Sequence, residues 1–407
     1  MKIRSVTGFY DPGAARAGYT LARLSALAQA AQATFGSAGY PVQTLRLATV
    51  PFPLMAPTCC DDSALNLVRT LEGEATRAGF DYLSLGPALP EEPQSYRLIP
   101  QMLAETQRCF FGGLMTRSGA VDLAAVRACG QVIAEAARLT ADGFANLRFA
   151  ALANVPAGGP FFPAAYHAAR HPAGFALALE AADVALQAFD AASTLAEAQQ
   201  NLLAALERAT GELLPLAEAL ALRHKVNFAG FDISLAPFPG ELTSLGAALE
   251  RLGLPALGWA GSTAAAAFLA STLDRGNWRR AGFNGLMLPV LEDSTLAARA
   301  AEGVLTAKDL LLFSTVCGAG LDTLPLPGDS SPEQLSALLL DVAALACRLN
   351  KPLTARLMPV PGKQAGEQTS FVFDYFVNSR VMALPAQPLR ALLAGDALLP
   401  LPPRPMN

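Results

Sequence analysis

The sequence has few charged residues and few cysteines. Charged residues make up 16% of the 407 residues and hydrophobic residues 52%, which indicates that much of the chain is buried. The net charge is −4 and no basic tract is present, so nucleic acid is not an expected partner. The six cysteines lack CxxC or other metal-ligand spacing and are too few for a disulfide scaffold. We expect reduced thiols, a cytoplasmic protein and no metal site.

Membrane and export signals are missing as well. The N-terminal sequence MKIRSVTGFYDPGAA contains no apolar h-region before Asp11, so a secretory signal is not expected. Two uncharged stretches, 149–169 and 252–273, are long enough to span a membrane, but Pro and Gly interrupt both. We expect neither export nor membrane insertion.

Nucleotide and hydrolase motifs are also absent, and the histidines are few. There is no Gly-x-Gly-x-x-Gly fingerprint, Walker loop or Gly-x-Ser-x-Gly elbow, so the sequence points to no cofactor. His167 and His171 have the spacing of two metal ligands on one helical face, but the Glu of the zinc-protease pattern does not follow His167. A hydrogen-bonding role for His167 near the site is the favoured interpretation, and metal binding is the alternative.

Short β-rich runs alternate with longer helical runs along most of the chain. The strand candidates are 3–7, 42–50, 81–85, 110–115, 147–152, 228–235, 285–290 and 354–360. The helical runs are 17–33, 63–78, 121–139, 177–209, 242–252, 263–273 and 333–349. This alternation predicts an α/β fold of parallel strands joined by crossover helices. We expect one domain over residues 1–407, with a helical lobe at about 165–225.

Several strand candidates hold polar side chains inside an apolar run: Arg4, Arg46, Arg148, Arg356 and, within one strand, Asp232 and Ser234. Because side chains alternate faces along a strand, these residues face away from the helix-packed side, into the lumen if the sheet is a closed barrel. A buried guanidinium needs a counter-charge, water or an anionic ligand. The functional interpretation is a carboxylate or phosphate site that uses at most two of the arginines. The alternative is an internal salt-bridge layer with acids such as Asp232.

Two loops combine helix starts with polar groups. Gly261, Ser262 and Thr263 open an uncharged helix whose first amides could bind an anion, or Ser262 or Thr263 could simply cap the helix. Glu292 and Asp293 follow a strand candidate and could supply general acid/base carboxylates or oxygen ligands for a metal. The favoured alternative is that they cap the next helix.

Cys317 lies in the sequence VCGAGLD, where glycines would let a turn bring the thiol near a substrate. A nucleophilic Cys needs a basic neighbour to lower its pKa, and none is adjacent in sequence. A buried, inert thiol is therefore the alternative. The pair Cys59-Cys60 at a helix start is a weaker candidate of the same kind.

Motifs from both halves of the chain resemble a known family. They are IRSVT, LRLATVPFP and FFPAAYH in the N-terminal half, then FDISLAPFP (231–239), GWAGSTAA (258–265), GLMLPVLED (285–293), STVCGAGLDTLPLPG (314–328) and KPLTARLMPVPGK (351–363). Their order resembles domain of unknown function 711, related to uncharacterised protein family 0210.

The resemblance implies a fold like that of pyruvate formate-lyase, a ten-stranded α/β barrel with a loop threaded into it. In an eight-stranded barrel the side chains just fill the interior. A ten-stranded barrel is wider, so it has room for a polar lumen. The Cys317 loop is one candidate for the threaded loop, and Cys59-Cys60 is a weaker one. Glycyl-radical chemistry does not carry over, because Arg380-Val381-Met382 is followed by Ala383 where those enzymes have glycine.

The C-terminal end departs from the family pattern, since Gly-rich sequence gives way to FVFDYFVNSR. Family members are often encoded beside small ACT-domain proteins, which implies a small regulatory partner.

The leading hypothesis is an enzyme or former enzyme that binds a small anionic metabolite, a carboxylate or phosphate. Arg46 and Arg356 are its anion clamps, Asp232 and Glu292 its acid/base candidates, and Cys317 its nucleophile. The rival hypothesis is a metabolite-sensing or scaffolding protein without turnover that acts with the ACT-like partner. A third is a homo-oligomer whose inner arginines are all salt-bridged.

Overall fold

The computed structural model describes residues 1–55, 61–316 and 319–403. Cys317 and the pair Cys59-Cys60 lie outside these ranges. The roles predicted for them, as nucleophile or as threaded loop, therefore stay predictions.

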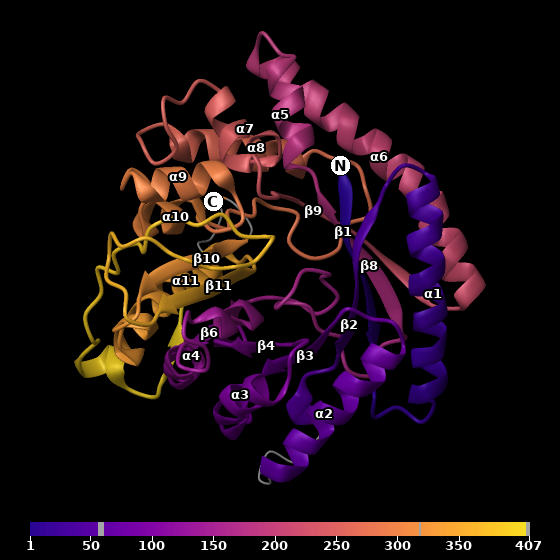
Figure 1. The fold of residues 1–407 in the computed structure, drawn as a ribbon, viewed down its shortest axis with the longest axis horizontal. Helices are drawn as coiled ribbons and strands as arrows, with labels where there is room; N and C mark the ends of the chain where they lie inside the picture. The colour runs from indigo at the N-terminus through magenta and orange to yellow at the C-terminus, as the bar shows by residue number, and fades with distance from the viewer. Residues whose placement is uncertain (56–60, 317–318, 404–407) are drawn as a thin grey trace.

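Strands and helices alternate in the structure as they do in the sequence pattern (Figure 1). The strands are β1 (Lys2–Tyr10), β2 (Val42–Thr49), β3 (Tyr82–Ala88), β4 (Cys109–Leu114), β5 (Thr116–Arg117), β6 (Ala120–Asp122), β7 (Phe149–Ala153), β8 (Gly174–Glu180), β9 (Asn227–Ala236), β10 (Gly320–Pro327), β11 (Leu353–Val360) and β12 (Leu398–Pro400). The α-helices are α1 (Ala17–Ser37), α2 (Asp61–Arg77), α3 (Gln94–Glu105), α4 (Leu123–Ala136), α5 (Ala182–Asp190), α6 (Leu195–His224), α7 (Leu245–Arg251), α8 (Ser262–Asp274), α9 (Ser294–Ala301), α10 (Ala307–Phe313) and α11 (Pro332–Leu349). Short 3₁₀ helices include η2 (Phe144–Arg148).

Within the described residues, nine strands form one sheet in the order β10-β11-β7-β4-β3-β2-β1-β8-β9. Most neighbours are parallel, but β8 is antiparallel to β1 and β11 is antiparallel to β7. The prediction of parallel strands throughout is therefore wrong at these two positions. Residues 154–173, all of them described, contain no helix between β7 and β8. A parallel crossover normally uses a helix, so its absence here accompanies the change of strand direction.

Two strands of the nine-stranded sheet, β8 and β10, were not predicted, and one predicted strand is not formed. β8 overlaps the start of the predicted helical run 177–209. Ala and Leu favour helices, and pairing with β1 and β9 makes this segment a strand. β10 follows the predicted Cys317 turn. Residues 285–290 run between the edge strands without forming a regular strand, with Met287 N donating to Ser234 O and Val290 N to Asp322 O. The described structure is thus a mixed α/β fold.

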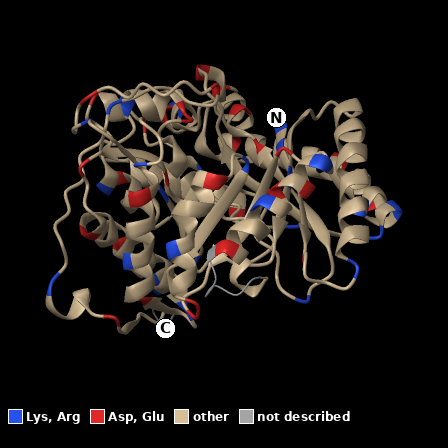
Figure 2. Ribbon diagram, turned by 60° about the horizontal axis from the view of Figure 1, so that its bottom comes forward, with Lys and Arg blue, Asp and Glu red and all other residues tan. Residues whose placement is uncertain are grey.

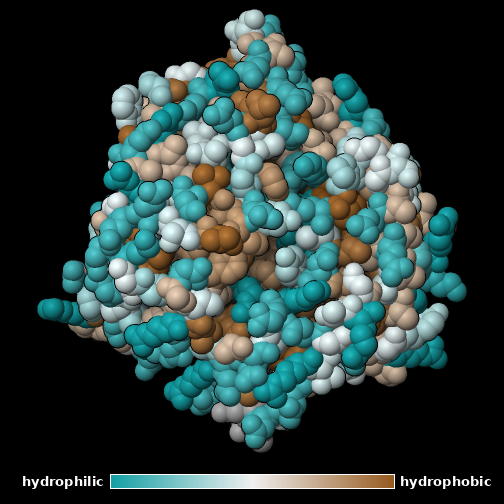
Figure 3. Space-filling model, in the orientation of Figure 1, coloured by the Kyte–Doolittle hydropathy of each residue, from teal (hydrophilic) through white to brown (hydrophobic). Residues whose placement is uncertain are grey.

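The helices bury the apolar side of the strands. Leu47 of β2 is fully buried in the main hydrophobic core together with Leu24 and Leu27 of α1, as expected for the side opposite Arg46. In Figure 1, α1 and α6 lie side by side along one flank, and the C-terminal segment passes along the opposite flank. Figure 2 shows Lys and Arg interspersed with Asp and Glu on the helices. Figure 3 shows apolar side chains in the middle of one otherwise mostly hydrophilic face.

Local capping signals set several helix ends. At the start of α11 the Ser331 hydroxyl accepts from Gln334 N, and the Gln334 side chain accepts from Ser331 N, a capping box with Pro332 in the first turn. The helix ends at Leu349, and the next residue, Asn350, adopts the left-handed conformation that often terminates helices. This cap fixes where the chain enters β11 and therefore where Arg356 lies.

The range predicted as a helical lobe, about 165–225, contains α5 and all of α6, but it also contains β8 of the sheet. The lobe boundary stays a prediction. In the part of the chain that the structure describes, no helix is both long and apolar enough to cross a membrane.

Candidate functional site

A cavity of about 280 Å³ brings together charged residues from distant parts of the chain. Its charged lining consists of Arg4, Arg46, Arg148, Glu292, Asp322 and Arg356. All four arginines predicted to face away from the helices therefore line one space. The volume is near the lower end of the roughly 300–1,000 Å³ found for small-molecule sites.

Aromatic side chains supply much of the remaining wall of the cavity. They are Tyr82, Phe110, Phe144, Phe161, Phe162, Phe283, Phe373 and Tyr375. The site thus combines fixed charges with large apolar surfaces, as small-molecule sites commonly do.

Two of the arginines are held in a buried network of ion pairs. Arg4 donates to Glu180 at 3.0 Å and also to Glu292. Arg356 donates through Nη2 to Glu292 at 2.7 Å and through Nε to Asp322 at 2.5 Å. Glu292 therefore bridges Arg4 and Arg356, and each arginine also has a second carboxylate.

Strand pairing explains why these residues meet. The antiparallel register of β1 and β8 pairs Lys2 with Glu180, so the Glu180 carboxylate lies within reach of Arg4. The parallel pairing of β10 and β11 brings Asp322 beside Arg356. Glu292 comes from the segment that follows residues 285–290, next to β10. Contacts between residues up to 288 positions apart thus depend on tertiary pairing.

Burial and pairing shift the pKa values of the network in different directions. Burial acts to lower the pKa of Arg4 and of Arg356, but the neighbouring carboxylates outweigh it and raise both. Burial acts to raise the pKa of Glu292, but Arg4 and Arg356 outweigh it and lower it. For Asp322 and Glu180 burial prevails over the arginines and raises the pKa. Glu292 is therefore the most firmly ionised acid of the network.

Arg46 differs from the paired arginines. Its Nε donates to the Thr44 hydroxyl at 2.9 Å, and its guanidinium lies 5.2 Å from the ring centre of Phe162 and 5.9 Å from that of Tyr82. Within the described residues it forms no ion pair, although its exposed fraction is only 9%. Burial, together with repulsion from Arg4, lowers the pKa of Arg46 to about 10. Its terminal nitrogens are therefore the best placed donors for an anion in the cavity.

Arg148 is engaged by backbone carbonyls. It is the last residue of η2, one position before β7 and not within the strand as predicted. Its guanidinium donates to Leu103 O at 2.7 Å, Thr106 O at 2.9 Å and Cys109 O at 3.3 Å. These bonds tie η2 to the end of α3 and the start of β4. Burial lowers the pKa of Arg148.

Asp232 and Ser234 are buried but contribute nothing to the lining formed by the described residues. Asp232 accepts hydrogen bonds from Ser234 Oγ at 2.5 Å, Phe283 N at 2.7 Å and Asn284 N at 2.9 Å. Burial raises the pKa of Asp232 to about 6. Asp232 forms no ion pair within the described chain, so the interpretation of Asp232 as an arginine partner is wrong. It anchors the segment that follows residue 281.

Glu292 and Asp293 have different roles, one in the cavity and one at a helix end. Glu292 joins the ion-pair network, whereas Asp293 caps α9 by accepting from Thr295 N at 2.9 Å and Leu296 N at 3.1 Å. Asp293 also accepts from Leu245 N at 2.7 Å, at the start of α7. One carboxylate therefore reaches the cavity and the other joins two helix ends.

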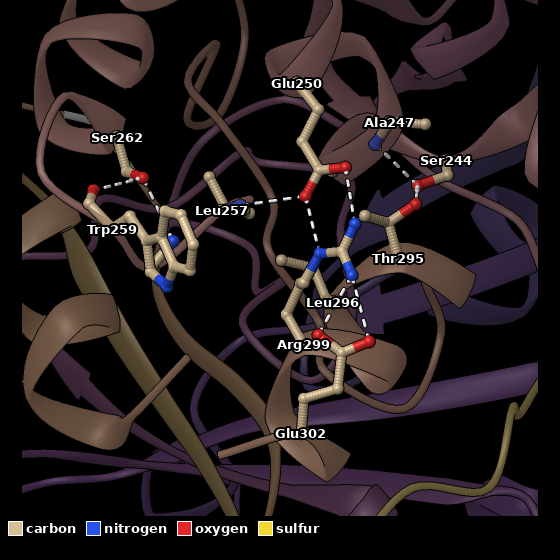
Figure 4. A network of polar contacts seen from close by, with 12 residues as sticks. Ser244, Ala247, Glu250, Leu257, Trp259, Ser262, Thr295, Leu296, Arg299 and Glu302 are labelled. Atoms are coloured by element: carbon tan, nitrogen blue, oxygen red, sulfur yellow. Dashed lines mark hydrogen bonds and ion pairs between the residues drawn. The ribbon is translucent and has the colours of Figure 1, made fainter. Parts of the chain in front are cut away.

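The Gly261 to Thr263 loop lies away from the lining made by the described residues. Gly261 precedes α8 in a left-handed conformation, and no described side chain caps the helix. The Ser262 hydroxyl instead donates to Trp259 O at 2.7 Å and accepts from Gly258 N at 3.0 Å (Figure 4). A helix cap by Ser262 or Thr263 is therefore not formed, and anion binding at this loop stays a prediction.

His167 lines a different cleft from the arginines. Its Nε2 lies 3.1 Å from the backbone oxygen of His171, its ring stacks on Phe9, and burial lowers its pKa. Because the segment is not helical, the four-residue spacing does not place both imidazoles on a helical face. Among the residues that the structure describes, no group of three His, Cys, Asp or Glu side chains could hold a metal ion.

Sequence patterns missed Glu180, Asp322 and the aromatic pair Phe373 and Tyr375. Glu180 is the last residue of β8, a strand whose Ala- and Leu-rich composition predicted a helix. Asp322 lies in GLDTLPLP, where the β-rich composition was a usable signal. In FVFDYF the aromatic residues Phe371, Phe373 and Tyr375 recur at every second position, which is the period of an extended segment.

Comparisons with known proteins agree with the resemblance of the motifs. The family model described as Uncharacterised ACR (DUF711) matches residues 1–378. A UPF0210 protein of Syntrophobacter fumaroxidans is 32% identical over 356 residues, which are 82% of this chain and 77% of the relative. A UPF0210 protein of Pelotomaculum thermopropionicum is 30% identical over 377 residues, 88% of this chain and 81% of the relative. This chain belongs to the DUF711 family of uncharacterised proteins, whose curated relatives are named UPF0210 proteins.

Proposed function

We propose that this chain binds a small organic anion, a carboxylate or a phosphate, in the arginine-lined cavity, with Arg46 as the principal contact. The observation that carries this proposal is a buried guanidinium whose terminal nitrogens have no carboxylate partner among the described residues. A buried charge in this position is expensive unless something compensates it. An anion entering the cavity would do so.

The surroundings of Arg46 favour an oxyanion. Phe162 and Tyr82 cover the guanidinium, and Thr44 accepts from Nε, so the edge that bears Nη1 and Nη2 is left for a ligand. Two parallel N–H donors match the two oxygens of a carboxylate or phosphate. Because these contacts hold the Arg46 guanidinium in place before binding, less conformational entropy is lost when the anion associates.

The other arginines are less suited to direct contact. Arg356, the second predicted clamp, already donates to Asp322 and Glu292, and an anion would have to displace one of them. Arg148 donates to three carbonyls. We therefore assign these arginines a supporting role, in which they fix the walls and contribute positive potential.

Binding without turnover is the form of this function that the geometry favours. An acid/base group must exchange a proton with a ligand, but Asp232 is fully engaged by Ser234 and two backbone amides. Glu292 is firmly ionised between two arginines. A metabolite-sensing role for the cavity requires neither group to react.

Two further parts of the proposal concern fold and compartment. We propose that residues 279–290 complete a ten-stranded barrel, because Ala281 N donates to Phe231 O of β9 and Val290 N donates to Asp322 O of β10. We also propose a cytoplasmic location, since Cys109, Cys129 and Cys347 are buried free thiols among the described residues.

The test is thermal unfolding with a panel of anions at constant ionic strength: formate, acetate, phenylacetate, succinate and phosphate. We expect at least one to raise the Tm of the wild-type protein by about 3 °C at a concentration of about 100 Kd. Arg46→Met should abolish that rise because it removes the donor edge and keeps an apolar side chain between the rings. Its Tm without ligand should equal or exceed that of the wild type, because an unpaired buried charge is gone.

Arg138→Met is the matched control, since Arg138 is an exposed arginine outside the cavity lining formed by the described residues. It should retain the full response to the anion. The proposal is wrong if no anion stabilises the wild type, or if Arg46→Met responds as strongly as the wild type does.

A further inference from the structure

The C-terminal aromatic loop, residues 369–379, is a fixed part of the cavity wall. Its two ends are joined because Thr369 N donates to Ser379 O at 2.8 Å and Ser379 N donates to Thr369 Oγ1 at 2.9 Å. Inside the loop, Asn378 accepts from Phe371 N at 2.8 Å and donates to Phe371 O at 3.0 Å. Val377 N also donates to Leu291 O, next to Glu292 of the ion-pair network.

Side chains along this loop alternate between the protein and the solvent. Phe371 is buried, Val372 is 100% exposed, and Asp374 is exposed. Phe373, between Val372 and Asp374, and Tyr375, directly after Asp374, are half-buried and line the cavity. Their rings therefore keep apolar surface that a bound molecule could cover.

The rings contributed by the loop extend an aromatic wall. Phe373 lies 5.1 Å from Phe144 and 5.1 Å from Tyr375, measured between ring centres. A second aromatic group is formed by Phe110, which lies 5.3 Å from Phe162 and 5.3 Å from Tyr82, the two rings that cover Arg46. Both groups line the same cavity as the Arg46 guanidinium.

We infer that the ligand is a monocarboxylate with an aromatic or similarly apolar body. Its carboxylate binds the free edge of Arg46, and its body packs on the aromatic wall to which Phe373 and Tyr375 belong. This inference rests on the proposed anion-binding function and narrows it to one class. The aromatic loop then determines specificity.

The charges of the lining favour one negative charge on the ligand. Arg46 is the only arginine lining the cavity that donates to neither a carboxylate nor a carbonyl within the described residues. A dicarboxylate or a phosphate dianion would bring a second negative charge toward Glu292 and Asp322, where the arginine donors are already engaged. Like charges in a buried site oppose each other strongly.

The experiment is isothermal titration calorimetry of the full chain with phenylacetate, acetate, succinate and phosphate. Phenylacetate should bind at least about tenfold more tightly than acetate, because its ring removes additional apolar surface from water. Succinate and phosphate should bind no more tightly than acetate. Arg46→Met should remove the binding of phenylacetate.

Variants of the loop separate the ring contacts from the charge contact. Phe373→Ala should weaken phenylacetate binding about tenfold and leave acetate binding unchanged, since only the aromatic body reaches this wall. Phe373→Leu, which retains more of the packing, should give a smaller loss in the same direction. Val372→Ala is the matched control because its side chain points to solvent, and it should change neither affinity.

The outcomes distinguish this inference from the proposed function. If acetate, succinate or phosphate binds through Arg46 at least as tightly as phenylacetate, the aromatic class is wrong and the anion site stands. If Phe373→Ala and Phe373→Leu leave the phenylacetate affinity unchanged, the role of the loop is wrong. If none of the four anions binds in an Arg46-dependent manner, both the inference and the proposed function are wrong.

Discussion

Glu292→Gln tests whether the buried ion-pair network is as tightly coupled as its geometry indicates. The Glu292 carboxylate is 5% exposed and accepts from both Arg4 and Arg356. The substitution keeps the size of the side chain but removes the charge that both arginines share. Each arginine keeps one acid, because Glu180 still pairs with Arg4 and Asp322 with Arg356.

The expected loss of stability follows from this partial compensation. Breaking a buried ion pair by removing one partner typically destabilises a protein by about 3–5 kcal/mol, and the remaining acids place this variant near the lower end, about 3 kcal/mol. An unfolding entropy of about 2.1 cal/mol/K per residue gives roughly 0.85 kcal/mol/K for a chain of this length. The expected decrease in Tm is therefore about 3–4 °C.

Differential scanning calorimetry of wild type and variant measures this decrease. Glu302→Gln is the matched control. Glu302 pairs with Arg299 (Figure 4), but its side chain is 49% exposed. An exposed pair contributes about 0–1 kcal/mol, so the control should lose about 1 °C or less. A decrease for Glu292→Gln no larger than that for Glu302→Gln would refute the coupled network.

Two further predictions concern Asp232 and the segment it anchors. Since burial raises the folded-state pKa of Asp232 to about 6, the carboxyl contributes stability that is complete below its ordinary pKa and is lost as the pH rises through about 6. The difference in unfolding free energy between wild type and Asp232→Asn, from urea titrations, should therefore fall by about 2 kcal/mol between about pH 4 and pH 7, and a constant difference would contradict the shift. Gly282 has a φ of 74°, and a Cβ there would lie 2.0 Å from Asp232 Oδ2, whereas Gly39 has a φ of 88° with no described neighbour within 4 Å. Urea titrations should show Gly282→Ala to be about 1–3 kcal/mol more destabilising than Gly39→Ala, and equal losses would show that the Asp232 contact is unimportant.

The sequence predicts those residues of the site that local patterns reveal. Arg46 and Arg356 stand out because a charge inside an apolar strand must face away from the helices, and period-two alternation is a local property. The partners of these residues are set by strand order. Glu180 reaches Arg4 only through the antiparallel pairing of β8 with β1, which no local propensity encodes.

The same reasoning explains which arginine is left for a ligand. From sequence, Arg46 and Arg356 are equivalent, because each is an arginine in a strand candidate. In the fold, Asp322 of β10 and the bridging Glu292 occupy Arg356, whereas rings and a hydroxyl surround Arg46. The aromatic loop was unexpected because the C-terminal departure from the family pattern gave no indication that it returns to the cavity.

The central claim is that a carboxylate binds the free edge of Arg46. The most direct measurement is a crystal structure of the protein soaked with 4-bromophenylacetate, in which the anomalous signal of bromine locates the ring. The carboxylate oxygens should lie about 2.7–2.9 Å from the Arg46 terminal nitrogens, with the bromine against the wall of Phe144 and Phe373. A bromine peak outside the cavity, or a carboxylate bound to another residue and not to Arg46, would contradict the claim.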